Sequence, residues 1–355
     1  MRWSKKLFAT GMKEVNMMSL KKSTLDQIVM KFKTLKPVLV VGDLGVDKYT
    51  FGEVKRISPE APVPVLEVSK EWDKLGLAAN VADNLKSLTI ESTLCGLVGN
   101  DSRASLVEHL LEERGLKTWG IVRDPSRHTT YKERVTTATQ QICRVDYETK
   151  DPISDEISKK ILKRINELKS SHSGLIIEDY GKGLFTQNFC QNLIQEFKKL
   201  NMLVTVDPSR VTPPLWYKGA TLLKPNRVEA ELMVEALGYF KEKNLQKMAE
   251  ILIDKLSLEK LVITLGAEGM AIYDTKTPEA GLKIIPTAAN EVFDVSGAGD
   301  TVIAALTSSL LAGATLEEAA WIGNCAAGVV VKKRGTALCS LDELKVHHEQ
   351  YLSTL

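Results

Sequence analysis

The residues best suited to chemistry lie in a glycine-containing stretch late in the chain. It reads Asp294-Val295-Ser296-Gly297-Ala298-Gly299-Asp300-Thr301, and an apolar run typical of a helix follows it. The first N–H groups of a helix have no partner inside the helix, and together with the helix dipole they bind anions such as phosphate. Gly297 and Gly299, with the small Ala298 between them, would let a phosphate approach the backbone closely.

Asp300 would stand in the first turn of that helix, beside the anion site. A carboxylate there would repel a bound phosphate, so anion binding alone does not explain its presence. The position makes sense if Asp300 takes the proton from a hydroxyl group that attacks the phosphate. The alternative is a helix that begins with an ordinary acidic first turn, and a short glycine motif does not decide between the two.

A second candidate site follows a short predicted strand and reads Lys224-Pro225-Asn226-Arg227-Val228-Glu229. Asn226 and Glu229 are three residues apart, so on a helical turn they face the same way. An amide and a carboxylate in this arrangement can hold a hydrated Mg²⁺ ion. The alternative is a capping box, which needs the same two residue types at the same spacing.

A third candidate is the turn from Thr264 to Gly269, which joins two predicted strands. Gly266 and Gly269 fit a hairpin turn, and they would equally let the ribose and phosphates of a nucleotide lie against the backbone. Polar residues also end several apolar runs, and ligands bind at that edge of a parallel sheet. These residues include Asp43, Asp179, Asp207 and Asn226, and Asp47 follows the first of them closely.

The elements that must position these residues alternate between strands and helices, which predicts an α/β fold around a mostly parallel sheet. Helices are expected over 24–35, 103–114, 154–169, 186–200, 226–236 and 244–256, with another opening at Gly76. Strands are expected at 38–43, 89–98, 116–122, 175–179, 203–207, 221–223, 261–264 and 270–273. Two β-rich segments, about 48–69 and 128–147, interrupt this alternation, and we expect them to form a small sheet that acts as a lid.

The composition is that of an ordinary globular chain of 355 residues, with 44% apolar residues, 26% charged residues and a formal net charge of +2. This charge argues against nucleic acid as a partner, and no apolar run approaches the ~18 residues that a membrane span needs. The five cysteines show no metal or disulfide spacing, which favours a cytoplasmic protein. We expect residues 1–22 to be a flexible extension, residues 23–355 to form one domain, and His347 and His348 to be solvated.

The three motifs together resemble the PfkB or ribokinase family of carbohydrate kinases, from about residue 36 to 345. The resemblance implies a ribokinase-like three-layer sandwich and an ATP-dependent sugar kinase. It places ATP along residues 226–229, the turn at 264–269 and Asn324, with Mg²⁺ near Glu229 and Asn226. Asp300 would be the catalytic base, residues 297–299 would stabilise the transferring phosphoryl group, and Asp47 and Asn80 would hold sugar hydroxyl groups.

Within that family the chain is most similar to the D-glycero-β-D-manno-heptose-7-phosphate kinases. The segments that carry this similarity are 56–65, 140–146 and 179–183. They imply a sugar phosphate as substrate, phosphorylation of its anomeric hydroxyl to the 1,7-bisphosphate, and a role in the heptose of lipopolysaccharide. Candidate contacts to the sugar phosphate are Asp43, Arg56, Lys132, Arg144, Asp179 and Lys182.

The resemblance also implies a homodimer that forms through the lid, because unpaired sheet edges favour association. Bifunctional members of the group carry a C-terminal nucleotidyltransferase domain, and we expect that second activity to be absent here. One departure concerns Leu77, where related kinases usually have a second glycine before Ala78-Ala79-Asn80. Two alternatives stay open: a PfkB-type kinase for another sugar, and a catalytically silent binding protein on the same fold.

Overall fold

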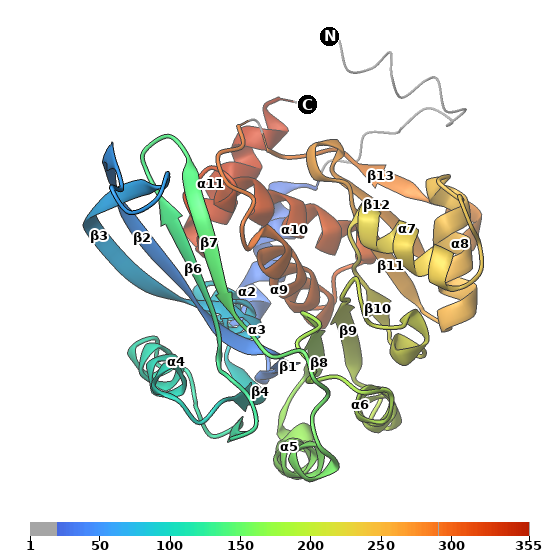
Figure 1. Ribbon diagram of the computed structural model, residues 1–355. Coiled ribbons are helices and arrows are strands. Elements are labelled where there is room, and N and C mark those ends of the chain that lie inside the picture. Colours follow the sequence, from blue (N-terminus) through green and yellow to red (C-terminus); the bar gives the residue numbers. More distant parts are fainter. Residues whose placement is uncertain (1–19, 290, 355) are drawn as a thin grey trace.

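A central sheet organises the fold, and a computed structural model describes it for residues 20–289 and 291–354 (Figure 1). Its nine strands follow the order β13-β12-β11-β10-β9-β8-β1-β4-β5. The strands are β1 (Val38–Gly42), β4 (Ser92–Val98), β5 (Ile121–Arg123), β8 (Gly174–Glu178), β9 (Leu203–Asp207), β10 (Leu222–Leu223), β11 (Lys260–Thr264), β12 (Met270–Asp274) and β13 (Lys283–Ile285). All neighbouring pairs are parallel except those on either side of β12.

Helices cover both faces of this sheet, because its strands are apolar on both sides. In β1, Val38 and Val40 join one core while Leu39 and Val41 join the other. The first core contains α2 (Lys22–Phe32), α3 (Ala78–Ser87), α4 (Ser102–Glu113), α9 (Ala298–Leu311), α10 (Leu316–Val330) and α11 (Leu341–Leu352). The second contains α5 (Asp155–Leu168), α6 (Gln187–Lys199), α7 (Arg227–Ala236) and α8 (Leu245–Leu256). The predicted three-layer α/β sandwich is confirmed.

The register of the parallel strands brings their carboxyl ends to one edge. Gly42 pairs with Glu178, and Glu178 pairs with Asp207. The polar residues that end these strands therefore lie side by side, although long stretches of sequence separate them. This edge is where the predicted site should form.

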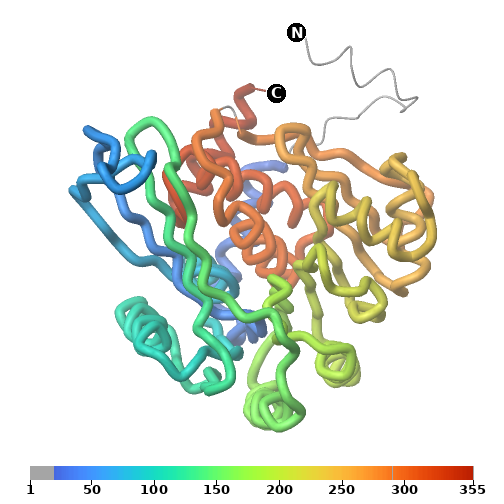
Figure 2. The backbone as a smooth tube through the Cα atoms, viewed as in Figure 1, coloured from blue at the N-terminus to red at the C-terminus, as the bar shows by residue number. Residues whose placement is uncertain are grey.

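The two β-rich segments form a separate four-stranded sheet, the lid, in the order β3-β2-β6-β7 (Figure 2). Its strands are β2 (Leu44–Ile57), β3 (Pro64–Leu77), β6 (Thr130–Thr136) and β7 (Gln141–Tyr147). The predicted small sheet is confirmed: β6 and β7 lie within the predicted segment 128–147, whereas β2 and β3 extend beyond the predicted segment 48–69. The pairing of β2 with β3 runs from Ile57 opposite Pro64 down to Leu44 opposite Leu77, so the helix predicted to open at Gly76 begins at Ala78.

The last helix, α11, corrects the expectation that His347 and His348 are solvated. Both side chains are buried, at 4% and 1% exposure. His348 accepts a hydrogen bond at Nδ1 from the indole of Trp321, at 3.0 Å, and Nε2 of His347 lies 3.0 Å from the carbonyl oxygen of Ala288. The segment looks polar, but its apolar positions and histidines share the face that packs on α10.

The N-terminal extension predicted for residues 1–22 lies mostly outside the described residues. Within the described part, Leu20 is buried and α2 begins at Lys22. None of the helices in the two described ranges is long and apolar enough to span a membrane.

Candidate active site

The loop before α9 has the geometry expected of an anion site. Gly297 precedes the helix with φ of 75°, and no side chain caps the helix there. The first-turn N–H groups of α9 therefore have no partner from a capping side chain or from the helix itself. A Cβ atom at Gly297 would lie 2.8 Å from Nδ2 of Asn80, so a larger residue would be both strained and crowded.

Asp300 is held from two sides at the start of α9. The side-chain amide of Asn80 donates a hydrogen bond to Oδ2 at 2.6 Å, and the hydroxyl of Tyr180 donates to Oδ1 at 2.6 Å. Asp300 is only 5% exposed. Burial raises the pKa of its carboxyl group, whereas the hydrogen bonds from Tyr180 and Asn80 act in the opposite direction. The two hydrogen bonds thus give the Asp300 carboxylate a fixed orientation at the start of α9.

Asn80 therefore contacts the predicted base directly. This contact is part of a hydrogen-bond network that joins α3 to α9. Asn84, one turn later on α3, donates to the backbone oxygen of Asn80 at 2.8 Å and accepts from the hydroxyl of Thr301 at 2.7 Å. Asn80 and Asn84 are both buried, at 2% and 1% exposure. A substrate contact of Asn80 stays a prediction.

Leu77, the departure from the related kinases, adopts φ of 59° immediately before α3. This left-handed region favours glycine, so the leucine costs conformational energy there. Its side chain is buried and packs close to Gly45 of the neighbouring strand β2.

Of the two aspartates after β1, Asp47 forms an ion pair with the guanidinium of Arg134 on β6, at 2.7 Å. Asp43 instead accepts hydrogen bonds at Oδ2 from the backbone N–H groups of Tyr180 and Lys182, each at 3.2 Å. Burial, and next the charge of Asp179, raises the pKa of Asp43 to about 7. Asp43 therefore holds the loop after β8, whereas Asp47 pairs within the lid sheet.

Asp179 is committed to the protein itself. Its Oδ2 accepts from the hydroxyl groups of Thr212 and Tyr217, each at 2.7 Å, and its Oδ1 accepts from the N–H of Gly181 at 2.7 Å. These contacts shape the loop from 179 to 183 rather than present a free carboxylate. The substrate contact predicted for Asp179 stays a prediction.

The four predicted cations of the sugar side differ in their surroundings. Lys182 pairs with Glu148, and Arg144 pairs with Asp146 at 2.8 Å on the exposed strand β7. Arg56 is exposed on β2. Lys132 makes no ion pair with any described residue and lies 5.5 Å from the ring centre of Tyr180. Burial lowers the pKa of Lys132, with Asp47 opposing this effect, so Lys132 is the cation that most needs an anion.

On the other side of α9, Asn226 and Glu229 form a capping box, which was the alternative to a magnesium site. The side chain of Asn226 accepts from the N–H of Glu229 at 2.9 Å, and Glu229 accepts from the N–H of Asn226 at 2.8 Å. Arg227 pairs with Glu268 at 3.2 Å, and Val228 is half exposed. The cap leaves the second oxygen of Glu229 facing only Arg210, at 3.4 Å, so the cap does not exclude a further ligand.

The turn after β11 lies beside this cap, because Asn226 and Thr264 form a β-bridge. The turn joins antiparallel strands β11 and β12, as the hairpin alternative required, and contains a short helical turn from Gly266 to Glu268. Gly269 has φ of 97°, and an added Cβ would lie 2.0 Å from a backbone oxygen of Ile285. Only glycine fits there.

Asn324 of α10, the remaining predicted nucleotide contact, is buried and holds the segment after β13. Its side chain accepts from the N–H of Ala288 at 3.3 Å and donates to the carbonyl oxygen of Pro286. Its predicted nucleotide contact stays a prediction.

A buried charge cluster that sequence reasoning missed lies behind the anion loop. Lys224 pairs with Asp207 at 2.6 Å, and a Cβ on Gly299 would lie 3.6 Å from the Lys224 ammonium. Burial raises the pKa of Asp207 to about 6, with Lys224 opposing it, and burial also raises the pKa of Glu178. Lys224 is the first residue of the motif in which Asn226 was considered a metal ligand. It directly follows strand β10, and this position at a strand end is the sequence signal that could have identified it.

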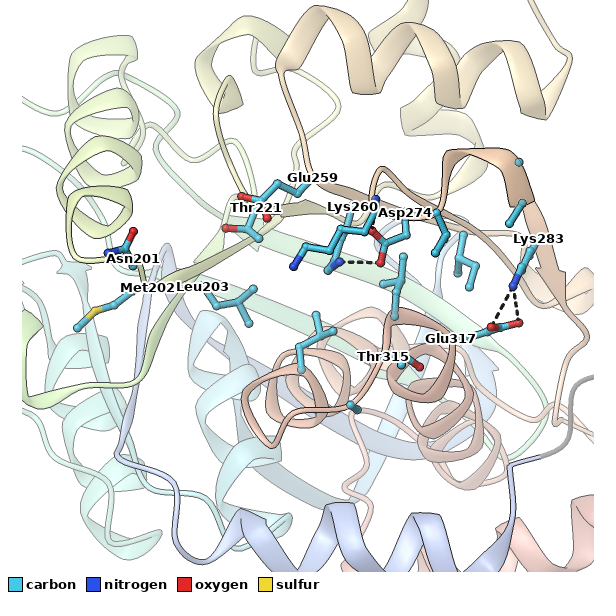
Figure 3. Close-up of a pocket in the computed structure, with 18 of the residues that line it drawn as sticks. Asn201, Met202, Leu203, Thr221, Glu259, Lys260, Asp274, Lys283, Thr315 and Glu317 are labelled. Carbon is cyan, nitrogen blue, oxygen red and sulfur yellow. Dashed lines mark hydrogen bonds and ion pairs between the residues drawn. The ribbon is translucent and has the colours of Figure 1, made fainter.

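A pocket of about 650 Å³ opens at the opposite edge of the sheet and contains none of the predicted site residues (Figure 3). Leu203, Thr221 and Lys260 line it at the starting ends of β9, β10 and β11. Two of its ion pairs, Lys260 with Asp274 and Lys283 with Glu317, neutralise four of its charged groups. The strand-end residues predicted for the site lie at the other edge of the sheet.

Comparison with known proteins identifies the family of the chain. The sequence profile described as "pfkB family carbohydrate kinase" matches residues 48–343. The chain belongs to this family. Membership makes the protein an ATP-dependent carbohydrate kinase and confirms the resemblance drawn from the motifs.

Curated relatives of this kinase include the bifunctional protein HldE of Helicobacter pylori (strain J99), which is 43% identical over 310 residues, or 87% of this chain and 66% of the relative. The HldE protein of Wolinella succinogenes is 43% identical over 314 residues, or 88% of this chain and 64% of the relative. The chain therefore spans slightly less than two thirds of the length of these relatives.

Solved structures share the fold at low sequence identity. Phosphofructokinase-2 from Escherichia coli in complex with fructose-6-phosphate has a TM-score of 0.71 at 18% identity and covers 90% of this chain and 99% of its own. Ribokinase from Thermotoga maritima has a TM-score of 0.68 at 21% identity, and the match covers 90% of this chain and 100% of the ribokinase chain. These similarities confirm the ribokinase-like fold of the kinase.

The raised pKa of Asp43 generates a prediction about stability. Between about pH 4 and pH 7 the folded kinase binds a proton that the unfolded chain releases, so the free energy of unfolding falls as the pH rises through this window. Asp43→Asn retains a side-chain oxygen for the two backbone N–H groups but cannot ionise. We expect its gain in unfolding free energy over wild type to be larger at pH 8 than at pH 5, by about 2 kcal/mol.

Chemical denaturation at the two pH values measures this difference. Asp151→Asn, at an exposed aspartate, is the control and should show the same small effect at both pH values. A gain for Asp43→Asn that does not change with pH would contradict the assignment.

Proposed function

We propose that this kinase transfers the terminal phosphoryl group of ATP to the anomeric hydroxyl of D-glycero-β-D-manno-heptose 7-phosphate, with Asp300 as the general base. The observation that carries the proposal is the buried carboxylate of Asp300 at the start of α9, beside first-turn N–H groups that can bind a phosphate. The identity of 43% to proteins named HldE and the resemblance of the lid to heptose 7-phosphate kinases support this sugar.

In the proposed reaction, the anomeric hydroxyl gives its proton to Asp300 as its oxygen bonds to the terminal phosphorus of ATP. The bond from that phosphorus to the bridging oxygen breaks, and ADP leaves with the electron pair. The N–H groups that follow Gly297 and the nearby ammonium of Lys224 would stabilise the charge on the transferring group.

ATP is proposed to lie along residues 226–229 and 264–269, with Asn324 supporting the segment behind them. Mg²⁺ is the proposed metal, and when bound it would neutralise charge on the phosphates. The oxygen of Glu229 that the cap does not use, which lies 3.4 Å from Arg210, fits a contact through water, which suits an ion that keeps most of its waters.

The phosphate of the sugar is proposed to bind at Lys132 and Lys182. Lys132 is half-buried, lacks an ion pair among the described residues and lies near Asp47, which is proposed to hold a sugar hydroxyl. Arg144 and Arg56 would contribute only after the lid closes, since both are exposed. Five free cysteines, four of them buried, support a cytoplasmic location as part of this proposal.

Asp300→Asn tests the base. The asparagine can accept from Asn80 and donate to Tyr180, so the fold and the binding of ATP should persist. We expect kcat to fall by ~10²–10⁴, the usual contribution of a general base. Steady-state kinetics, with a nucleotide-binding assay as control, measure both quantities, and turnover within a few-fold of wild type would remove Asp300 from the mechanism.

A sugar panel combined with Lys132→Met tests the substrate. We expect the wild-type kinase to prefer heptose 7-phosphate over free heptose, ribose and fructose 6-phosphate. Its kcat/KM for heptose 7-phosphate should exceed that for free heptose by about 10²-fold, because charge-assisted hydrogen bonds to the phosphate are strong. Lys132→Met should reduce the preference for phosphorylated over free heptose to a few-fold.

The control for that experiment is Lys48→Met. Lys48 lies on the opposite face of the lid sheet and pairs with Glu71 at 2.9 Å, so the preference should persist. If ribose or fructose 6-phosphate is used best, the kinase acts on another sugar. If no sugar causes ATP turnover, the catalytically silent alternative gains support.

We also propose that the kinase is a homodimer formed through the lid. Apolar side chains of the lid that are 37–60% exposed support this association: Val54, Ile57, Val63, Val68, Val145 and Tyr147. Val68→Lys should shift the sedimentation coefficient at micromolar concentration from dimer to monomer. Val346→Lys changes an equally exposed valine on α11 and should leave the dimer intact. A monomeric wild-type protein would contradict the proposal.

A further inference from the structure

Tyr180 is the contact of Asp300 that the sequence motifs did not assign. It follows β8, and its hydroxyl lies 2.6 Å from Oδ1 of Asp300, although the two residues are 120 positions apart in the chain. Asn80 takes the other oxygen, so each oxygen of Asp300 accepts one hydrogen bond from the protein. A carboxylate has further lone pairs, so both bonds can persist while a sugar hydroxyl approaches.

The loop that carries Tyr180 is fixed independently of Asp300. Asp43 accepts from the N–H of Tyr180 itself, and Asp179 accepts from the N–H of Gly181 and from two hydroxyl groups. Gly181 and Gly183 adopt φ of 65° and 87°, values that favour glycine. The hydroxyl of Tyr180 is therefore presented by a rigid loop and does not depend on Asp300 for its position.

The charged groups around Asp300 explain why such a donor is needed. Buried carboxylates near Asp300 oppose its ionisation, and one ammonium group favours it. The carboxylates belong to Asp47 of β2, Glu178 of β8 and Asp207 of β9, and the ammonium belongs to Lys224 after β10. Hydrogen bonds from Tyr180 and Asn80 also favour the charged form of Asp300.

We infer that Tyr180 is a positioning residue of this kinase: its hydroxyl holds Asp300 ionised and in one orientation for the acceptor hydroxyl. The inference rests on the proposed role of Asp300 as base and holds for any sugar that the kinase uses. Lys132 lies over the ring of the same tyrosine, so the residue that orients the base also borders the proposed phosphate site.

Tyr180→Phe, compared with Tyr217→Phe, tests the inference. Each substitution removes one tyrosine hydroxyl that donates to an aspartate of this region, at 2.6 Å for Tyr180 and 2.7 Å for Tyr217, but only Tyr180 contacts Asp300. We expect Tyr180→Phe to lower kcat by about tenfold or more and to leave the KM for ATP within about twofold. The acidic limb of its kcat profile should move to higher pH by about one unit, because the charged form of Asp300 loses a donor.

A titration without substrates separates this inference from the proposed function. The ¹³C resonance of the Asp300 carboxyl carbon is identified by its absence in Asp300→Asn, and its midpoint should move to higher pH in Tyr180→Phe. Tyr217→Phe should lower thermal stability yet leave both that midpoint and the acidic limb unchanged.

Two results would overturn the positioning role. The first is a Tyr180→Phe variant whose pH profile of kcat and whose titration midpoint of Asp300 both equal those of wild type. The other is an equal loss of kcat with equal pH shifts in both variants, which would show a general structural effect. Failure of heptose 7-phosphate as substrate, or full activity of Asp300→Asn, would instead count against the proposed function and leave the titration of Asp300 readable.

Discussion

The structure depends on keeping one carboxylate, that of Asp300, buried and ionisable at the start of a helix. Removing a charge from water is expensive unless hydrogen bonds replace its hydration. Here a tyrosine hydroxyl, an asparagine amide and the positive end of the α9 dipole replace it. Because the donors come from three distant segments, the correct packing of α3, α9 and the loop after β8 is a condition for the site.

That packing explains the small residues at the start of α3 and along α9. Ala78 and Ala79 are fully buried, as are Ala304 and Ala305, and the two helices contact one another closely. Larger side chains would push the helices apart and lengthen the bond from Asn80 to Asp300. The strained backbone of Leu77 lies at the same junction, so conformational cost is concentrated where α3 must begin in one exact orientation.

Periodicity in the sequence was enough to predict most of the sandwich, because strands such as β1 are continuous apolar runs and helices such as α6 repeat apolar residues every three or four positions. It did not reveal β13, which has three residues and includes a lysine, or the burial of His348, which depends on Trp321 of another helix. The position of Asp300 at the start of a helix could be predicted from a local motif. Tyr180 could not, because its role is defined by a partner 120 residues away that only the fold brings near.

The distribution of charge around Asp300 follows from the same arrangement. Carboxylates gather at the edge of the parallel sheet, where Glu178, Asp207 and Asp300 lie close together and Lys224 is the one ammonium paired into the cluster. Cations instead lie on the lid, where Arg134 pairs with Asp47 and Lys132 has no such partner among the described residues. If the acceptor sugar carries a phosphate, the lid supplies the charge that the sheet edge lacks. Docking of the lid would then bring a cation to the sugar phosphate and a hydroxyl to Asp300 in one movement, and the loop of Tyr180, which borders both, connects the two events.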